Sequence, residues 1–447
     1  MRLQRLTATA VVAVAAAGLV ACSSNTADAN TINWWTWDDK QAAGYQACAD
    51  KFHKDNPDLT VKISQYAVED YFTKLTAGFV AGDAPDAFQN SVQFFQAYTS
   101  QHQLLALDDL IKSGNFDLSR FSVGVDAWKY TDGKQYALPL DWAATGIFYD
   151  TDAITKAGYT PADVATLSWN PDNGGTFGKM VAHLTVDEHG KRGDQPGFDK
   201  SKVAVYGFGQ LAAKDFIGQT TWSSFVSTMG WRQGDKPSWP AKFNYADPRF
   251  VKTMDWVRSL TDRGFAPKIG EFTTSEVDQL ASGKVAMLTG GSWTASTFAK
   301  IPNMKVGIAP TVLGPDGRTR SVLSNSNGNN IWAGTPHPDL AWKWVSYMGS
   351  QECQTMASKT GTFFPSIAAS MDASAAAMAK DGIDLSVFTD ALSKGVLYPS
   401  VVYGNGAELQ STIEPLFEQF FAHSRDADVF AEMERKSRTI LAKSGQS

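Results

Sequence analysis

Residues 135–150 read QYALPLDWAATGIFYD, and this stretch sets the organisation that we expect for the chain. Large and small residues alternate in its first half, which predicts a strand. Pro139 places that strand at a sheet edge or leaving its sheet, because proline cannot donate a ladder hydrogen bond. Asp141-Trp142 then interrupts the pattern, and Gly146-Ile147-Phe148-Tyr149 resumes as a second strand. Two strands joined through Asp-Trp without turn residues predict a chain that crosses between sheets, with Asp141 and Trp142 facing a cleft.

Length and composition exclude several classes of protein. The chain has 447 residues, more than the roughly 250–300 residues that one core usually fills, so we expect more than one folded unit. Its net charge of −6 argues against a nucleic-acid partner, which requires a basic face. Aromatic residues make up 12% and include 14 tryptophans, enough to serve as binding platforms as well as core. The six histidines show no metal-ligand spacing, and we expect neither a metal nor a cofactor.

The first residues have the features of an export signal. Two arginines precede an apolar run at residues 8–21 that is too short to span a bilayer as a stable helix. The run ends LVAC at Cys22, which resembles a bacterial lipobox, whose cysteine becomes the first mature residue and carries acyl chains. We therefore expect a lipoprotein signal peptide at 1–21, lipidation of Cys22 and a flexible tether at 22–30. An ordinary secretion signal with a chance cysteine is the alternative.

The pattern that follows is typical of a parallel α/β sheet. Strands are predicted at 32–35, 59–63 and 87–89, and helices at 45–52 and 71–79. Functional side chains in such sheets lie just beyond the carboxyl ends of the strands. The sequence places Trp37, Asp38 and Asp39 beyond the first strand and Asn90 to Gln93 beyond the third. The three aspartates of this proposal, Asp38, Asp39 and Asp141, are either ligand contacts or helix caps.

The remainder of the chain is less regular. Residues 324–330 are rich in Asn, Ser and Gly and predict a polar loop, in which Asn327 and Asn330 either form turns or contact a ligand. A helix is predicted from residue 339 to about 357. The acidic loop at 187–199 has no clear ligand spacing, and a calcium ion there stays an open possibility.

Several motifs together resemble the extracytoplasmic solute-binding proteins of bacterial ABC importers. The resemblance is to family 1, the carbohydrate-binding class that includes maltose-binding protein, and it extends over nearly the whole mature chain. The motifs are the lipobox, the opening strand with Trp-Asp, Gly82-Asp83-Ala84-Pro85-Asp86, Tyr136-Ala137-Leu138-Pro139-Leu140-Asp141, Lys284-Val285-Ala286-Met287 leading to Gly290-Gly291-Ser292-Trp293, and Gly307-Ile308-Ala309-Pro310.

The resemblance implies an α/β, two-lobed periplasmic-binding-protein-like fold of type II with a ligand cleft between the lobes. Hinge crossovers are expected near 140, 309 and 365–375. The expected lobes are 31–140 plus 310–370 for lobe 1, and 141–309 plus 371–447 for lobe 2.

The resemblance also implies a set of ligand-binding residues, carried over position by position. The chain departs from the family between Asn90 and Gln93, where members often place an aromatic or charged group, so the ligand's identity stays open. The expected set is Trp37, Asp38, Asp39, Asn90, Gln93, Asp141, Trp142, Trp222, Gly291, Trp293, Asn327, Phe364 and Tyr403.

A sugar fits these residue types. Aromatic rings cover the apolar C–H face of a pyranose, and carboxylates and amides bond its rim of hydroxyls, so that mismatched sugars leave buried polar groups unpaired. We therefore expect a monomeric carrier of a carbohydrate, most simply an oligosaccharide. Its expected partners are ABC permease subunits with a cytoplasmic ATPase, and the lipid on Cys22 is expected to hold it to the outer face of the cell membrane.

Two alternatives come from other classes of protein. One is a surface-anchored adhesin or lectin, and the other is a glycoside hydrolase. The hydrolase requires two carboxylates about 5–10 Å apart around a glycosidic bond. The sequence has no Gly-x-Ser-x-Gly elbow and no metal-hydrolase motif, and we expect no enzymatic activity.

Two cysteines remain once Cys22 is set aside. Cys48 and Cys353 lie on helices that the resemblance places in lobe 1, in an oxidising compartment. They form either a disulfide or a pair of buried free thiols.

Overall fold

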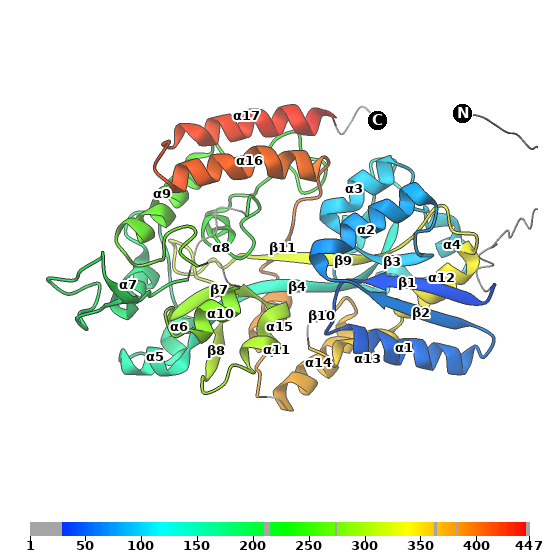
Figure 1. Ribbon diagram of the computed structural model, residues 1–447, viewed down its shortest axis with the longest axis horizontal. Helices are drawn as coiled ribbons and strands as arrows, with labels where there is room; N and C mark the ends of the chain where they lie inside the picture. The colour runs from blue at the N-terminus through cyan, green and yellow to red at the C-terminus, as the bar shows by residue number, and fades with distance from the viewer. Residues whose placement is uncertain (1–28, 210–214, 273–274, 362–363, 381, 444–447) are drawn as a thin grey trace, which may run out of the picture.

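The computed structural model of the chain describes residues 29–209, 215–272, 275–361, 364–380 and 382–443. The expected signal peptide, Cys22 and the tether up to residue 28 lie outside the described residues. Two lobes lie side by side, and long strands run from one into the other (Figure 1). Within the described ranges, no helix combines the length and apolar character that crossing a membrane requires.

Lobe 1 is a twisted sheet covered by helices on both faces (Figure 1). Strand β1 pairs in parallel with β2 and β3, as the sequence pattern predicted. Trp34 and Tyr45 belong to the core on one face, and Phe88 and Phe95 belong to the core on the other. The elements are β1 (Thr31–Thr36), α1 (Ala42–Asp55), β2 (Thr60–Gln65), α2 (Val68–Ala81), β3 (Ala87–Ser91), α3 (Val92–Ser100), α4 (Asp108–Ser113), α12 (Pro338–Met348) and α13 (Gln351–Ser358). The single helix predicted from 339 is therefore two, separated at Gly349 and Ser350.

The stretch that opened the sequence is one continuous strand, β4 (Ala137–Asp150), and not two strands. Its first half pairs with β9 (Val322–Ile331) and β10 (Phe364–Pro365), and its second half pairs with β7 (Met287–Gly291) and β8 (Val306–Ala309). The register with β9 shifts between Pro139 and Asp141. The expected crossing between lobes is present, but it occurs inside a strand, because a bulge bends a strand without ending it.

The polar segment predicted as a loop at 324–330 is the middle of β9, a buried strand between β3 and β4. Its side chains find partners inside the fold: Trp34 Nε1 donates to Asn329 Oδ1 at 2.9 Å, and Asn330 Nδ2 donates to the carbonyl of Tyr136 at 2.8 Å. These bonds offset the cost of burying amides. Strand β11 (Leu397–Pro399) pairs with the lobe 2 end of β9.

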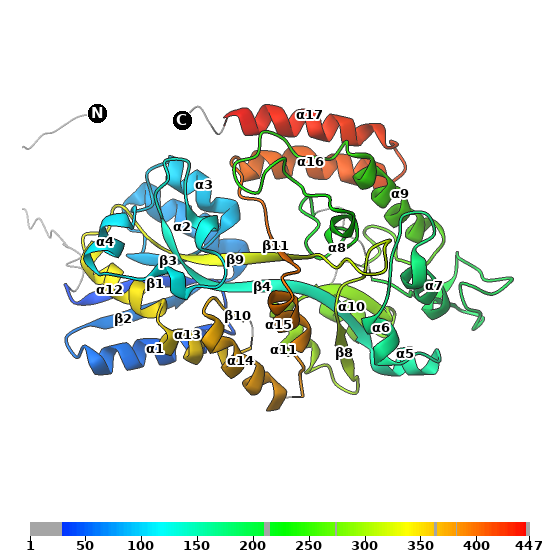
Figure 2. The same ribbon diagram turned by 180° about the vertical axis from the view of Figure 1, so that it is seen from behind.

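Lobe 2 has one large aromatic core that includes Trp222, Phe250 and Tyr403. The C-terminal helices α16 and α17 lie along its outer side (Figure 2) and contribute to this core. Its elements, besides β7 and β8, are α5 (Thr151–Lys156), α6 (Pro161–Ala165), α7 (Gly175–Leu184), β5 (Val186–Asp187), β6 (Val203–Val205), α8 (Ser223–Val226), α9 (Pro248–Asp262), α10 (Glu276–Ala281), α11 (Ala295–Phe298), α16 (Gly406–Phe421) and α17 (Asp428–Lys443). Helices α14 (Ala368–Lys380) and α15 (Ser386–Ser393) contribute to a separate core below the crossing strands.

Residues 310–321, which we expected in lobe 1, bond to lobe 2. Leu313 exchanges backbone hydrogen bonds with Leu167 and Trp169, and Val312 belongs to the lobe 2 core. The return to lobe 1 therefore occurs along β9 and not near residue 309. The lobe boundary was misplaced because residues 324–330 were predicted as a loop, and no strand was expected to cross between the lobes there.

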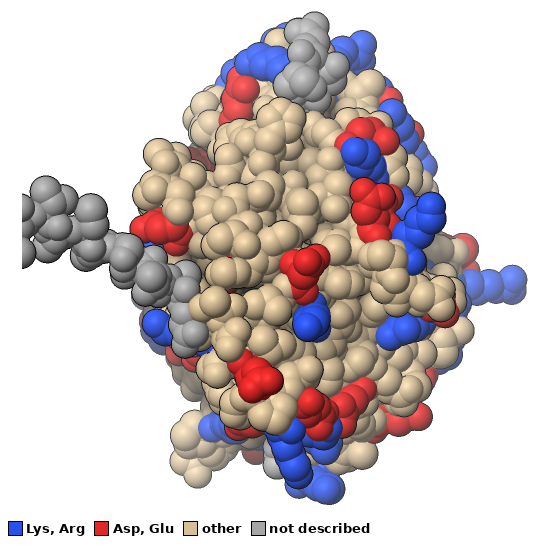
Figure 3. All heavy atoms as spheres, turned by 90° about the vertical axis from the view of Figure 1, so that its right-hand side faces the viewer, with Lys and Arg blue, Asp and Glu red and all other residues tan. Residues whose placement is uncertain are grey.

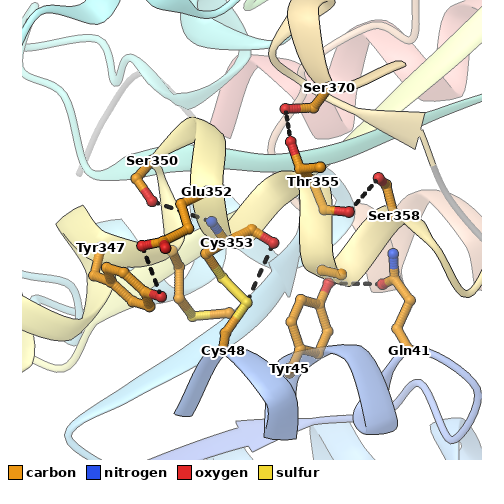
Figure 4. Close-up of a disulfide and its surroundings, with 12 residues drawn as sticks. Gln41, Tyr45, Cys48, Tyr347, Ser350, Glu352, Cys353, Thr355, Ser358 and Ser370 are labelled. Atoms are coloured by element: carbon orange, nitrogen blue, oxygen red, sulfur yellow. Dashed lines mark hydrogen bonds between the residues drawn. A yellow bond between two sulfur atoms is a disulfide. The ribbon is translucent and has the colours of Figure 1, made fainter. Parts of the chain in front are cut away.

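Helices α1 and α13 are joined through Cys48 and Cys353 (Figure 4). Their sulfur atoms lie 2.11 Å apart and their Cα atoms 5.2 Å apart, as in a disulfide. The helices touch closely beside this link, since a Cβ atom on Gly44 would lie 2.8 Å from the Cα atom of Ala357. Helix α1 begins just after the loop at residues 37–40, which we call the first binding loop because it holds three of the expected ligand contacts, and this contact between helices anchors that loop to the lobe.

The outer end of lobe 1 carries acidic and basic side chains intermixed around its rim (Figure 3). A basic stripe of the kind that binds nucleic acid is missing from the face in view.

Candidate functional site

A cleft of about 680 Å³ lies between the lobes, beyond the carboxyl ends of β1, β2 and β3. Most of its wall comes from lobe 1, one residue comes from the turn that follows β7 in lobe 2, and two come from β9. The lining residues are Trp37, Asp38, Asp39, Lys40, Gln65, Ala67, Val68, Phe72, Ser91, Gln93, Trp293, Asn325 and Asn327.

The loop after β1 contributes four consecutive residues to the cleft. Asp38 is 7% exposed, and its Oδ1 accepts hydrogen bonds from the amides of Lys40 at 2.9 Å and Gln41 at 2.8 Å. It therefore caps the turn that leads into α1 while it lines the cleft. Burial raises the pKa of the Asp38 carboxyl. Asp39 and Lys40 are exposed, so both charges lie next to solvent.

The Trp37 indole is partly exposed and held by the rings beneath it. Its centroid lies 5.2 Å from that of Tyr71 and 5.3 Å from that of Phe72. The Gln65 amide donates to the Trp37 carbonyl at 3.1 Å, which ties the loop to the end of β2. These contacts fix the ring, and a fixed ring loses little conformational entropy when a ligand covers it.

Trp293 is the cleft residue that lobe 2 supplies, and Gly291 gives its ring space. A Cβ atom on Gly291 would lie 2.2 Å from the Trp293 ring, so the indole lies directly over that glycine. Gly291 itself does not line the cleft. The predicted Gly-Gly-Ser-Trp loop therefore provides one contact residue and one residue that makes room for it.

Asn327 lines the cleft near the crossing strands, and Asp141 lies behind it. They are register partners across β9 and β4, and Asn327 Nδ2 donates to Asp141 Oδ1 at 2.8 Å. Asn327 lines the cleft, whereas Asp141 is 2% exposed and does not. Burial, together with the nearby charge of Asp38, raises the pKa of Asp141 well above its usual value.

Trp142 and Phe364 lie away from the cleft. Successive side chains of a strand point to opposite faces, so Asp141 and Trp142 cannot both face one cleft. Trp142 is fully buried, donates to the Pro365 carbonyl at 3.0 Å and packs against the Phe364 ring at 4.7 Å. Both residues belong to the core below the crossing strands, so the prediction that they contact the ligand is wrong.

The prediction that Asn90 contacts the ligand is wrong for the same reason. It is fully buried in β3 and next to Ser91, the residue of that strand that lines the cleft. Asn90 therefore points to the opposite face of the sheet. Gln93, two residues further, lines the cleft from the first turn of α3.

Trp222 and Tyr403 lie in the core of lobe 2 and not in the cleft. Trp222 is 1% exposed and packs edge-on against Phe250 at 5.0 Å, and Tyr403 is 3% exposed beside Phe243 at 5.5 Å. Their placement as ligand contacts is wrong, because nothing in their local sequence separates a core ring from a ligand platform.

Seven residues that line the cleft were not in the set predicted from the sequence: Lys40, Gln65, Ala67, Val68, Phe72, Ser91 and Asn325. Gln65 is the last residue of β2. The rule that functional side chains lie at the carboxyl ends of parallel strands, which identified Trp37 after β1, would also have identified Gln65, but it was not applied to the second strand. Lys40 is the next residue of the loop after β1, and Phe72 lies near the start of α2 on the side that faces the cleft. Asn325 was hidden because β9 was predicted as a loop.

The acidic loop at 187–199 folds around one carboxylate. Asp187 Oδ1 accepts from the amides of His189 and Lys191, and Oδ2 accepts from that of Asp199, each at 2.9 Å. These amides take the role that the calcium ion would have had. Among the described residues, no group of three His, Cys, Asp or Glu side chains is arranged to hold a metal ion.

The sequence from residue 47 to 383 matches the profile of the bacterial extracellular solute-binding proteins. The chain belongs to this family. Members of the family bind solutes outside the cytoplasm, and they are not enzymes.

Named relatives are distant. The maltodextrin-binding protein MdxE of Bacillus subtilis is 24% identical over 339 residues, which cover 74% of this chain and 73% of that protein. The lactose-binding protein of Rhizobium radiobacter is 29% identical over 178 residues, 38% of this chain, and the chain spans only 40% of that protein's length. Among solved structures, the ABC substrate-binding protein Lmo0181 from Listeria monocytogenes in complex with cycloalternan superposes with a TM-score of 0.76, at 20% identity and over 92% of this chain and 99% of that one. The fold is thus the two-lobed type II fold of periplasmic binding proteins.

Proposed function

We propose that this chain is the substrate-binding component of a bacterial ABC importer and that it captures a carbohydrate, an oligosaccharide, in the cleft between its lobes. The observation that carries the proposal is the pairing of Trp37 from lobe 1 with Trp293 from lobe 2 in one cleft. The names of the maltodextrin- and lactose-binding relatives support the same class of ligand.

The wall of the cleft suits a polyol with an apolar face. Two indoles from different lobes offer flat surfaces for pyranose C–H groups. Between them lie carboxylate, amide and hydroxyl groups that accept and donate hydrogen bonds. Two aspartates and one lysine give the lining an excess of negative charge, which disfavours an anionic solute.

The lobes can capture a ligand by closing on it, because residues of both lobes line the cleft. A ligand that touches Trp37 and Trp293 together favours the closed arrangement, because both contacts exist only when the lobes approach. Long strands β4 and β9 pass through the junction, and bending about them opens the cleft. The closed form is the one that we expect the permease subunits, with their cytoplasmic ATPase, to receive.

Two rival functions are less well supported. A glycoside hydrolase needs two carboxyl groups free to reach the glycosidic bond, yet Asp141 is buried and Asp38 uses one oxygen on backbone amides. An adhesin or lectin has no need of a binding site divided between two lobes. We therefore propose transport without catalysis, by a monomer that the acyl chains of Cys22 hold at the outer face of the cell membrane.

A thermal-shift panel of mono- and oligosaccharides, with a glycerophosphodiester as the anionic comparison, tests the proposal. A cognate sugar at a hundred times its dissociation constant stabilises the fold by about 2.7 kcal/mol. Trp293→Ala is expected to lower the affinity by about tenfold or more, with an unchanged circular dichroism spectrum. Stabilisation by the phosphodiester alone, or full sugar affinity in Trp293→Ala, would contradict the proposed site.

A further inference from the structure

The buried Asp141 carboxyl group is linked to the cleft by a hydrogen bond from Asn327, which lines the cleft. The two residues lie directly opposite each other in antiparallel strands, so their side chains leave the sheet on the same face. Asn327 lines the cleft and donates from Nδ2 to Asp141 Oδ1 at 2.8 Å, while Asp141 stays behind it.

The surroundings of Asp141 hold few charges. The titratable groups that face it are Asp38 and Tyr45, at the start of α1. The Tyr45 hydroxyl donates its one proton to Gln41 Oε1 at 2.6 Å (Figure 4). Helices α12 and α13 and strand β10 contribute uncharged neighbours, among them Met348 and Gln354. Burial and the Asp38 charge raise the pKa of Asp141, against the effect of the hydrogen bond from Asn327.

An asparagine amide can present either of two faces, and its partner decides which. An ionised carboxylate only accepts hydrogen bonds, so Asn327 must turn Nδ2 toward Asp141 and keep Oδ1 for another donor. A protonated carboxyl group can donate to Oδ1, and the amide is then free to turn and offer Nδ2 instead. The charge on Asp141 therefore selects the group that Asn327 offers to a ligand.

We propose that Asp141 is a positioning residue, which orients the Asn327 amide so that its Oδ1 accepts a hydrogen bond from a hydroxyl group of the ligand. The proposal rests on the proposed function for the existence of that ligand. It replaces the expectation that Asp141 itself contacts the sugar. An amide that donates to a carboxylate is also polarised, which strengthens its carbonyl as an acceptor.

The first test needs no ligand. The Asn327 side-chain NH₂ signals in the nitrogen–proton NMR spectrum are identified as those lost in Asn327→Ala. In the wild-type protein we expect them to shift with pH, with a midpoint above the usual aspartate value, and in Asp141→Asn we expect that shift to vanish. Signals that do not move with pH in the wild type overturn the proposal, even if Asp141→Asn fails to fold.

The second test is a double-mutant cycle with maltotriose, or with the sugar of the panel that gives the largest thermal shift. Asp141→Asn is expected to lower affinity about tenfold in the wild-type background and less than about twofold in Asn327→Ala. An equal loss in both backgrounds means that Asp141 acts independently of Asn327, which overturns the proposal. Asp172→Asn, an exposed carboxylate in lobe 2, is the control for charge alone.

The two tests separate this inference from the proposed function. If no sugar binds the wild-type protein, the proposed function fails, and the NMR titration still decides whether Asp141 orients Asn327.

Discussion

Lys40 Nζ in lobe 1 lies 2.5 Å from Thr297 Oγ1 in lobe 2, so a side chain that lines the cleft also joins the two lobes across it. A second contact joins the lobes between α3 and α16, where the Asn405 amide donates to Gln96 Oε1 at 3.2 Å. The lobes therefore touch through polar groups on both α1 and α3 sides of the cleft, and neither contact involves a ligand.

Replacing Lys40 with Met should open the ligand-free protein. An exposed contact of this kind contributes about 1 kcal/mol or less, so the melting temperature should change little while the lobes separate more often. Small-angle X-ray scattering should give a larger radius of gyration for ligand-free Lys40→Met than for the wild type, and equal radii at saturating sugar. Lys54→Met, at an exposed lysine in helix α1 that does not line the cleft, is the control, and equal ligand-free radii for Lys40→Met and the wild type would show that the contact has no such role.

The buried and cleft tryptophans should respond in opposite ways to truncation. Trp222→Ala removes a fully packed ring and should lower the free energy of unfolding by about 3–5 kcal/mol. Trp37→Ala should cost less stability, because this ring is partly exposed, but should lower sugar affinity. Urea unfolding and calorimetric titration separate the two effects, and a loss of affinity in Trp222→Ala but not in Trp37→Ala would remove Trp37 from the binding site.

A methyl group on Gly291 should weaken binding without touching the ligand. Its Cβ would overlap the Trp293 ring, which must then leave its position over the strand. We expect Gly291→Ala to lower affinity about as much as Trp293→Ala, and to add nothing in the Trp293→Ala background. Independent, additive losses in the double variant would mean that the glycine acts in another way.

The cysteine pair should be oxidised in the exported protein. Alkylation of the denatured, unreduced chain should leave Cys48 and Cys353 unmodified, and reduction should expose both. Because the link closes a loop of 305 residues, replacing both cysteines with serine should lower the free energy of unfolding by about 2–5 kcal/mol. Two thiols that react before reduction would contradict the bond between α1 and α13.

Stability should depend on pH through Asp141. Its pKa is raised in the fold, so the ionised form is disfavoured there, and stability is lost as pH rises from the usual value of 3.8 through the raised pKa. Asp141→Asn has no such group, so its free energy of unfolding relative to the wild type should increase with pH across that window. Urea unfolding at a series of pH values measures this difference, and a free energy of unfolding of Asp141→Asn that falls relative to the wild type as pH rises would contradict the prediction.

The α/β architecture and the first binding loop could be predicted because they depend on local patterns. Alternation and helical periodicity define β1, α1, β2 and α2, and the strand-end rule then identifies Trp37, Asp38 and Gln93. Trp142 could not be placed in the same way. Only the register of β4 against β9 decides which of two adjacent residues faces the cleft, and that register comes from residues far away in the sequence.

Strand β9 was missed because its composition favours turns. Asn, Ser and Gly bond readily to their own backbone in a loop, and here Asn327, Asn329 and Asn330 instead bond to Asp141, Trp34 and Tyr136. Such partners cannot be recognised without the fold. Missing this strand displaced the expected lobe boundary and concealed Asn325.

The order of strands in the sheet has a consequence for biosynthesis. Strand β9 lies between β3 and β4, and α16 and α17 complete the core of lobe 2. Segments synthesised early therefore lack their packing and pairing partners until much more of the chain has been made. Neither lobe can close on the ribosome before most of the polypeptide has emerged, because non-local contacts form only after both segments exist. We therefore expect the fold to be completed late, which is compatible with export of the chain before it folds.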